Sequence, residues 1–318
     1  MNATTQKCLS SLQLGKPQAH RNIVVFPLLG SPNGSSRWLT LGEAIEQRLL
    51  TVTEVSRNGS VPELIVSNHA SRPVLLLDGE ELVGAKQNRV LNTTILVKEQ
   101  SETVVPVSCT ERGRWSYVSA SFADAKVVMA SKIRVQKMMA VSESLDASAG
   151  YQSDQGAVWQ EIAALHAKAG ISSPTSAMHD VFKARERDLE ECLRTFAPIA
   201  DQIGLLVVID GDVAGFDVIR HPEVYALEHP KLVKSYVIEA IAQPSQGPAD
   251  LDAARVRASA FLGDVPGSAE RSFPSVGYGM DCRYSKGSLS GAALVHEDHV
   301  VHMAGKNELP LESTKKIR

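Results

Sequence analysis

The feature that most constrains the fold is a series of short β-branched runs in the first third of the chain, separated by turn residues. The runs expected to form strands are residues 22–29, 64–68, 73–77, 80–83, 90–97 and 103–109. One helix is expected among them, over residues 41–50, because its apolar residues fall on one helical face. Strands that follow one another without regular helical crossovers favour an antiparallel sheet or sandwich over a doubly wound fold.

Three tight turns are expected between neighbouring strands. Asp78-Gly79 separates residues 73–77 from 80–83, and Asp210-Gly211 separates residues 205–209 from 213–219. Asp-Gly tolerates the positive φ of a type I′ turn, so each pair predicts a hairpin. A last hairpin is expected over residues 291–305, turning at Glu297-Asp298.

The middle of the chain has the spacing of helices. Residues 158–165 repeat apolar side chains at helical intervals, with Ser153 or Asp154 available as the N-cap. Ser173-Pro174 is expected to open one long helix that ends at Gly204. Further helices are expected over residues 221–243, where Pro230 should break or kink the helix, and over 253–262.

These patterns predict an α+β fold, with a largely antiparallel sheet or sandwich and a helical central segment packed against it. We expect a flexible N-terminal tail (1–21), a β-rich region that carries the candidate site (22–122), a helical region (123–203) and a mixed hairpin and helix region (204–318). The first and last folded regions form either separate units or one globular unit.

Composition restricts the class of protein. The net charge of −3, from 33 basic and 36 acidic residues among 318, gives no strong indication of nucleic-acid binding. Residues 1–20 lack the apolar core of a signal peptide, and no apolar run approaches the ~20 residues of a membrane span. Four cysteines without a C-x-x-C pair fit a reducing compartment. We therefore expect a cytoplasmic protein with no membrane partner.

The small net charge hides two opposite segments. Residues 82–141 hold nine Lys or Arg against four acids, and residues 143–201 hold ten acids against five bases. The basic segment favours an anionic ligand, or the two segments pack together and neutralise each other.

The sequence has no clear motif for several well-known kinds of enzyme chemistry. The chain has no Walker, G-x-S-x-G or H-E-x-x-H motif, and Gly277-Tyr278-Gly279 lacks the third glycine of a dinucleotide loop. His299 and His302 are expected on opposite faces of a hairpin, so we predict no metal site. Cys109, followed five residues later by Arg114, resembles a rhodanese-like anion loop, but residues 115–122 alternate like a strand where that loop needs a helix.

Specific strings carry a family resemblance. They are GEELVGAKQNR (79–89), CTERGRW (109–115), SDQGAVW (153–159) and the stretch 204–235. Through them, most of the chain from about residue 20 resembles a prokaryotic family named for association with ARG and rhodanese-phosphatase-superfamily proteins. We take ARG to stand for ADP-ribosylglycohydrolase. The resemblance implies a context of nucleotide, ADP-ribose or phosphate metabolism and no particular activity.

The same strings supply a candidate site. The residues expected to bind a ligand are Lys86, Gln87, Asn88, Arg89, Arg112, Arg114 and Trp115. Arg and Lys hold phosphate, and the flat face of Trp stacks on a base. The candidate catalytic carboxylates are Glu80, Glu81 and Glu111. The structural alternative is a buried polar network that fixes the two loops.

Three functional classes follow. The first is a protein that binds a small anionic or nucleotide-like ligand. The second is a hydrolase of a phosphate or glycosidic centre, which requires that Glu80 or Glu81, or Glu111, converge with the arginines in one cleft. The third is a non-enzymatic regulatory or interaction module. The sequence identifies neither a cofactor nor an oligomeric state.

Overall fold

The computed structural model describes residues 1–31, 37–242 and 247–307. The fold is α+β, as the sequence predicts, with mostly antiparallel sheets and helices packed against them. The helices are α1 (Ala3–Ser10), α2 (Leu41–Glu46), α3 (Ser131–Asp146), α4 (Gln155–Ala169), α5 (Met178–Ala184), α6 (Glu186–Thr195), α7 (Pro222–Ile241) and α8 (Leu251–Asp264), followed by a 3-10 turn, Val265–Gly267. No helix in the described part of the chain is both long and apolar enough to span a membrane.

The largest sheet has nine strands in the order β1-β3-β13-β14-β18-β17-β16-β15, with β2 also beside β3. Its strands are β1 (Gln13–Leu14), β2 (Gln18–His20), β3 (Ile23–Leu29), β13 (Gln202–Ile209), β14 (Asp212–Ile219), β15 (Ala269–Pro274), β16 (Met280–Lys286), β17 (Leu289–His296) and β18 (His299–Asn307). Because β3 lies against β13, the first and last folded regions of the chain share this sheet.

Two smaller sheets come from the first third of the chain. One has the order β12-β8-β9-β11-β6-β5, formed by β5 (Leu50–Glu54), β6 (Glu63–Asn68), β8 (Glu80–Gly84), β9 (Arg89–Leu91), β11 (Ser101–Cys109) and β12 (Phe122–Val128). The other has the order β10-β7-β4, formed by β4 (Leu39–Thr40), β7 (Val74–Leu76) and β10 (Ile95–Val97). Only β4 and β7 run parallel among the described strand pairs.

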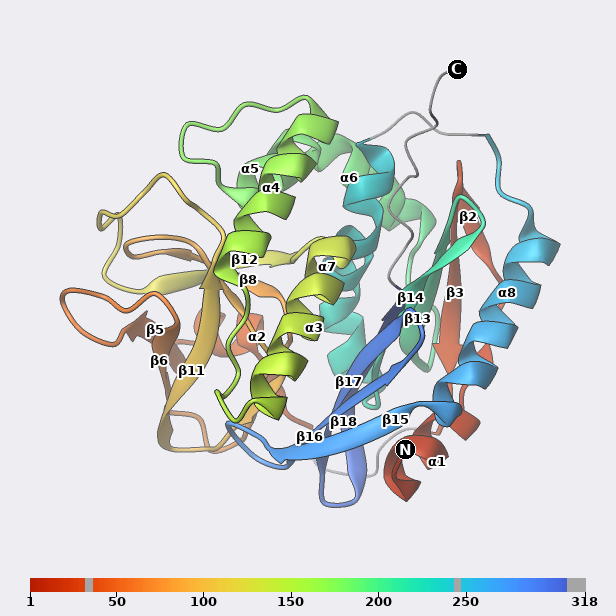
Figure 1. The fold of residues 1–318 in the computed structure, drawn as a ribbon, viewed down its shortest axis with the longest axis horizontal. Coiled ribbons are helices and arrows are strands. Elements are labelled where there is room, and N and C mark those ends of the chain that lie inside the picture. The colour runs from red at the N-terminus through yellow and green to blue at the C-terminus, as the bar shows by residue number, and fades with distance from the viewer. Residues whose placement is uncertain (32–36, 243–246, 308–318) are drawn as a thin grey trace.

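Three apolar clusters hold these layers together. One fills the space between the two smaller sheets and includes Val66, Leu76 and Val105. A second joins α7 to the nine-stranded sheet and to β12, through residues such as Leu205 and Leu232. The third packs α1 and α8 on the other face of the nine-stranded sheet. Figure 1 shows α7 between the two β-regions and α8 on the far side of β13 and β14.

The N-terminal segment corrects one prediction. Residues 1–21 are expected to be a flexible tail, but they contain α1, capped by Asn2, and strands β1 and β2 at the edge of β3. Cys8 is completely buried and Leu9 is 7% exposed, both in the cluster under α1 and α8. The segment is polar in composition because only one face of α1 is covered.

The turn at Asp78-Gly79 also differs from the prediction. It connects two sheets, since β7 lies beside β10 and β4 whereas β8 lies beside β9 and β12. Gly79 has a φ of 81° and Asp78 has no positive φ, so this is not a type I′ hairpin turn. At the other two turns both residues have positive φ, and β13–β14 and β17–β18 are the predicted hairpins.

Three further expectations need correction. The long helix after Ser173-Pro174 is divided into α5 and α6, because Arg185 leaves the helical region (φ −105°, ψ 16°). Helix α7 continues through Pro230, so the proline does not break the helix. Residues 115–121 are irregular, and β12 begins only at Phe122, so the segment after the candidate site is a loop and not a strand.

Candidate functional site

Glu80 lies in a buried cluster around one ammonium group. Its Oε1 is 2.5 Å from Lys231 Nζ, and its Oε2 accepts a hydrogen bond from the backbone N–H of Leu77 at 2.7 Å. Asp124 and Glu228 place carboxylate oxygens 3.0 and 3.2 Å from the same Nζ. We call Glu80, Asp124, Glu228 and Lys231 the Lys231 cluster.

Three carboxylates beside one cation leave excess negative charge in this cluster. Burial, opposed by Lys231, raises the pKa of Glu80 to about 8 and also raises the pKa of Glu228. The carboxyl groups of the Lys231 cluster therefore hold a proton to a higher pH than free glutamates do. Through the Lys231 ammonium, Glu80 connects β8 to α7 in the interior of the protein.

The Lys231 cluster predicts a pH-dependent stability. Because the folded pKa of these carboxyls exceeds the ordinary Glu value of 4.5, the folded state binds more protons, and stability falls as pH rises from about 4.5 toward 8. We expect Glu228→Gln to reduce that fall by roughly 1–3 kcal/mol. Urea unfolding between about pH 5 and 8.5 measures it. The exposed Glu143→Gln is the control, and equal pH profiles for wild type and Glu228→Gln would contradict the assignment.

Glu81 faces the opposite way from Glu80, as alternation along β8 requires. It is fully buried, and its Oε1 accepts a hydrogen bond from Thr110 Oγ1 at 2.7 Å. Its Oε2 lies 3.3 Å from Nδ1 of His179 on α5. The hydrogen bond that His179 donates to Glu81 raises the pKa of His179 above the usual histidine value.

Glu111 and Arg114 form a closed ion pair. Arg114 donates to Glu111 Oε2 from Nε at 2.9 Å and from Nη2 at 2.6 Å. Its remaining donors reach Asn88 Oδ1 and the backbone carbonyls of Gly84, Ala85 and Ser116. Although burial opposes it, the hydrogen bond from Arg114 lowers the pKa of Glu111. These residues form the polar network that fixes the two loops.

The three candidate carboxylates therefore do not share a cleft. Glu80 contacts Lys231, Glu81 contacts His179, and Glu111 contacts Arg114. The geometry that the hydrolase interpretation requires, with these carboxylates converging beside the arginines, is not present in the described residues. The described residues also contain no group of three or more His, Cys, Asp or Glu arranged to hold a metal ion.

Arg89, on β9, is the candidate whose side chain still has hydrogen-bond donors without an acceptor. Its side chain is fully buried, and its Nη1 donates to Gln87 Oε1 at 2.9 Å and to the Asn88 carbonyl at 3.4 Å. Its Nε and Nη2 have no hydrogen-bond partner, and no carboxylate of the described residues forms an ion pair with it. Burial lowers the pKa of this guanidinium. Buried donors without acceptors are rare in proteins.

Trp115 lies over Arg89, and Lys86 lies beside both Trp115 and Tyr117. The Arg89 Cζ is 5.6 Å from the centre of the Trp115 ring, and Lys86 Nζ is 5.1 Å from the centres of both aromatic rings. Trp115 is 48% exposed and Tyr117 49% exposed, on the irregular loop before β12. Arg89 therefore reaches solvent only if this aromatic cover moves.

Glu54 is a member of the same site that the sequence analysis missed. Its Oε1 accepts from the Lys86 backbone N–H at 3.3 Å, and its Oε2 is buried without a hydrogen-bond partner. A Cβ placed on Gly59 would lie 3.2–3.3 Å from Lys86, Glu54 Oε2 and Trp115, so these three side chains converge. We call Glu54, Lys86, Arg89, Trp115 and Tyr117 the Arg89 site.

Cys109 lies under this site as a protonated thiol. Its Sγ donates to Gln87 Oε1 at 3.0 Å, and it is completely buried at the end of β11. Burial raises the pKa of Cys109 to about 11, despite the nearby Arg89 charge. A nucleophilic loop needs a thiolate, so this cysteine acts as a packed donor and not as a catalytic thiol.

The remaining candidate, Arg112, lies apart from Arg89. It is exposed, and its Cζ is 5.4 Å from the ring centre of Trp159 on α4. Of the seven predicted ligand-binding residues, the structure brings Lys86, Arg89 and Trp115 to one place, with Gln87 and Asn88 beneath them and Arg114 engaged by Glu111.

These features define a class of α+β protein that has a buried arginine under an aromatic loop of its six-stranded sheet. Residues 11–305 match the family model of the ARG and Rhodanese-Phosphatase-superfamily-associated Protein domain, and the chain belongs to that family. No curated protein and no solved structure matches the chain. The family thus agrees with the resemblance carried by the GEELVGAKQNR and CTERGRW strings.

Proposed function

We propose that the protein binds a small anionic, nucleotide-like ligand at the Arg89 site. The observation that carries the proposal is that Arg89, fully buried, keeps two guanidinium nitrogens, Nε and Nη2, without an acceptor. A charged donor that is desolvated and unpaired destabilises the folded protein, and an anion removes that cost. The planar guanidinium is suited to the two oxygens of a phosphate or carboxylate.

The aromatic cover supports a ligand with a flat group. Trp115 and Tyr117 are half-exposed, and the ammonium of Lys86 lies near both rings. In the proposed complex the loop moves enough to admit the anionic group to Arg89, and Lys86 supplies a second positive charge. A base then stacks on the face of Trp115.

Glu54 supports a sugar phosphate as the anionic part. Its unpaired Oε2 is an acceptor beside the donors of Arg89 and Lys86. A ligand that carries a hydroxyl group next to its phosphate satisfies both, because the hydroxyl donates to Glu54 while the phosphate oxygens accept from the cations. The ADP-ribose association in the family resemblance agrees with this chemistry. Ligand binding requires no catalytic carboxylate, so we favour ligand binding over the hydrolase function. A regulatory module that responds to the ligand is compatible with this proposal.

Calorimetric titration with inorganic phosphate, ribose 5-phosphate and ADP-ribose tests this function. We expect a single site whose affinity rises in that order, and we expect Trp115→Leu to weaken ADP-ribose binding by about tenfold, or ~1.4 kcal/mol. Arg187→Met, which removes an exposed arginine on α6, is the control and should bind as wild type does. Absence of binding heat for all three compounds would refute the proposal, as would equal affinity in Trp115→Leu.

A further inference from the structure

A separate groove of about 400 Å³ lies between β12 and helices α5, α6 and α7. Its wall is apolar where Val127, Phe182, Leu189 and Leu193 meet. The charged and titratable residues that line it are His179 and Lys183 from α5, Glu186 and Glu190 from α6, Lys126 from β12 and Lys234 from α7. A groove of this volume that is lined by both apolar and charged side chains is typical of a small-molecule site.

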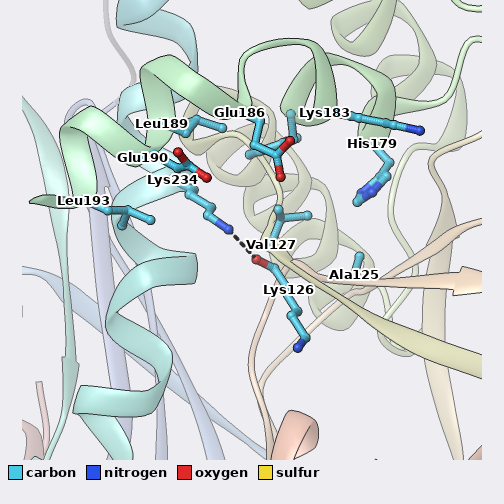
Figure 2. A pocket seen from close by; sticks show the side chains of 11 residues that line it. Ala125, Lys126, Val127, His179, Lys183, Glu186, Leu189, Glu190, Leu193 and Lys234 are labelled. Atoms are coloured by element: carbon cyan, nitrogen blue, oxygen red, sulfur yellow. Dashed lines mark hydrogen bonds between the residues drawn. The ribbon is translucent and has the colours of Figure 1, made fainter.

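His179 stands at one end of this groove, Glu190 and Lys234 lie toward the other, and Glu186 lies between them (Figure 2). Its Nδ1 is held by Glu81, a fully buried carboxylate whose second oxygen is held by Thr110. The side chain of His179 is 32% exposed, and Nε2 makes no hydrogen bond to the described residues. A buried carboxylate thus fixes this imidazole, with a ring nitrogen left for a ligand.

The positive groups of the groove are not equivalent. Figure 2 shows the side chains of Lys126 and Lys183 directed away from the groove, while the Lys234 ammonium donates to the Lys126 carbonyl at 3.2 Å. Lys126 instead pairs with Glu46 at 3.2 Å, outside the groove. Glu186 and Glu190 make the α6 side unfavourable for an anion. The end that favours an anion is therefore the one formed by His179.

We propose that this groove binds a small organic carboxylate, with the carboxylate group on His179 Nε2 and an apolar body against Phe182 and Leu189. The protonated imidazole donates to the ligand while Glu81 accepts from Nδ1, so the buried carboxylate positions the ring and balances its charge. Burial of the ligand's apolar body on the groove wall supplies the rest of the affinity.

This site is independent of the Arg89 site. Cys109 donates a hydrogen bond to Gln87, the residue that holds Arg89. The next residue, Thr110, donates a hydrogen bond to Glu81, the residue that holds His179. Their side chains point to opposite faces, so the two sites lie on opposite sides of this part of the sheet. Each proposal therefore has its own variants and its own ligand.

Calorimetric titration of the full-length protein with octanoate, and with octylamine, tests the proposal. We expect octanoate to bind at a single site, about tenfold more weakly at about pH 8.5 than at about pH 6, because His179 loses the proton that it donates to the ligand carboxylate. His179→Gln should remove that pH dependence and weaken binding at about pH 6. Lys126→Gln is the matched control for charge, and Arg89→Met should leave octanoate binding unchanged.

Three results would overturn the proposal. They are no binding of octanoate at about pH 6, wild-type affinity and pH dependence in His179→Gln, and preferential binding of octylamine, which would assign the groove to Glu186 and Glu190. If octanoate binding fell in Lys234→Gln and not in His179→Gln, the carboxylate would be at the other end of the groove, and the assignment to His179 would be wrong.

Discussion

Replacing Asp217 by asparagine is expected to lower the free energy of unfolding by about 3–5 kcal/mol. Asp217 is fully buried on β14 and accepts hydrogen bonds from Arg134 at 2.7 and 3.1 Å and from the Tyr236 hydroxyl at 2.6 Å. His302 Nε2 and Lys306 Nζ lie 3.1 and 3.5 Å from its oxygens. The pKa of Asp217 is held well below its usual range by Arg134 and Lys306, against the effect of burial.

The cost is large because the partners stay buried. Asparagine keeps the shape of Asp217 but removes its charge, which leaves Arg134 and Lys306 in the interior with one carboxylate, Asp78, nearby. Guanidinium chloride unfolding at neutral pH measures the effect. The control is Asp212→Asn at the exposed turn of the same hairpin, where we expect a change below about 0.5 kcal/mol. A change that small in Asp217→Asn would contradict this description of the network.

Replacing Arg89 by methionine is expected to raise the stability of the ligand-free protein by about 1–3 kcal/mol. Methionine replaces the aliphatic part of the Arg89 side chain under Trp115 and removes a buried charge whose Nε and Nη2 have no acceptors. The variant loses only the hydrogen bonds to Gln87 and to the Asn88 carbonyl. A residue whose removal stabilises the protein is maintained for something other than folding.

Chemical denaturation of both proteins measures this gain. The control is Arg112→Met, which removes an exposed guanidinium stacked on Trp159 and is expected to lower stability slightly or not at all. A loss of more than about 1 kcal/mol in Arg89→Met would mean that Arg89 is paired within the protein, and that it contributes to the core.

Local patterns predicted much of the fold. The hairpins β13–β14 and β17–β18 depend on strand alternation and on two consecutive residues that accept positive φ, and both are set by neighbours in sequence. Asp78-Gly79 carries the same local signal but connects two sheets, because β7 and β8 have better partners elsewhere in the fold. Residues close in sequence do not determine which strands pair, because that pairing depends on strands that lie further along the chain.

The candidate site was predicted in part for the same reason. The GEELVGAKQNR and CTERGRW strings placed Lys86, Arg89 and Trp115 together, because they lie on adjacent strands and one loop. They did not show that Arg114 forms an ion pair with Glu111, or that Nε and Nη2 of Arg89 have no hydrogen-bond partner. The structural network applies to Glu111 and Arg114, and ligand binding stays a prediction for Lys86, Arg89 and Trp115.

Two residues that matter most to the sites had weaker signals. Glu54 follows Leu50 and Val52 at alternate positions of β5, so a carboxylate on the buried face of a strand could have been noticed. His179 contacts Glu81 across 98 positions of sequence and has no local signal. Contacts over such separations come only from the tertiary structure.

The most direct test of the Arg89 site is the melting temperature of wild type and Arg89→Met, each with and without saturating ADP-ribose. We expect Arg89→Met to melt higher than wild type without ligand, and only wild type to gain stability with ligand, because a ligand stabilises by mass action only the state that binds it. An equal ADP-ribose shift in both proteins, or no shift in wild type, would contradict the proposal that Arg89 holds the anionic ligand.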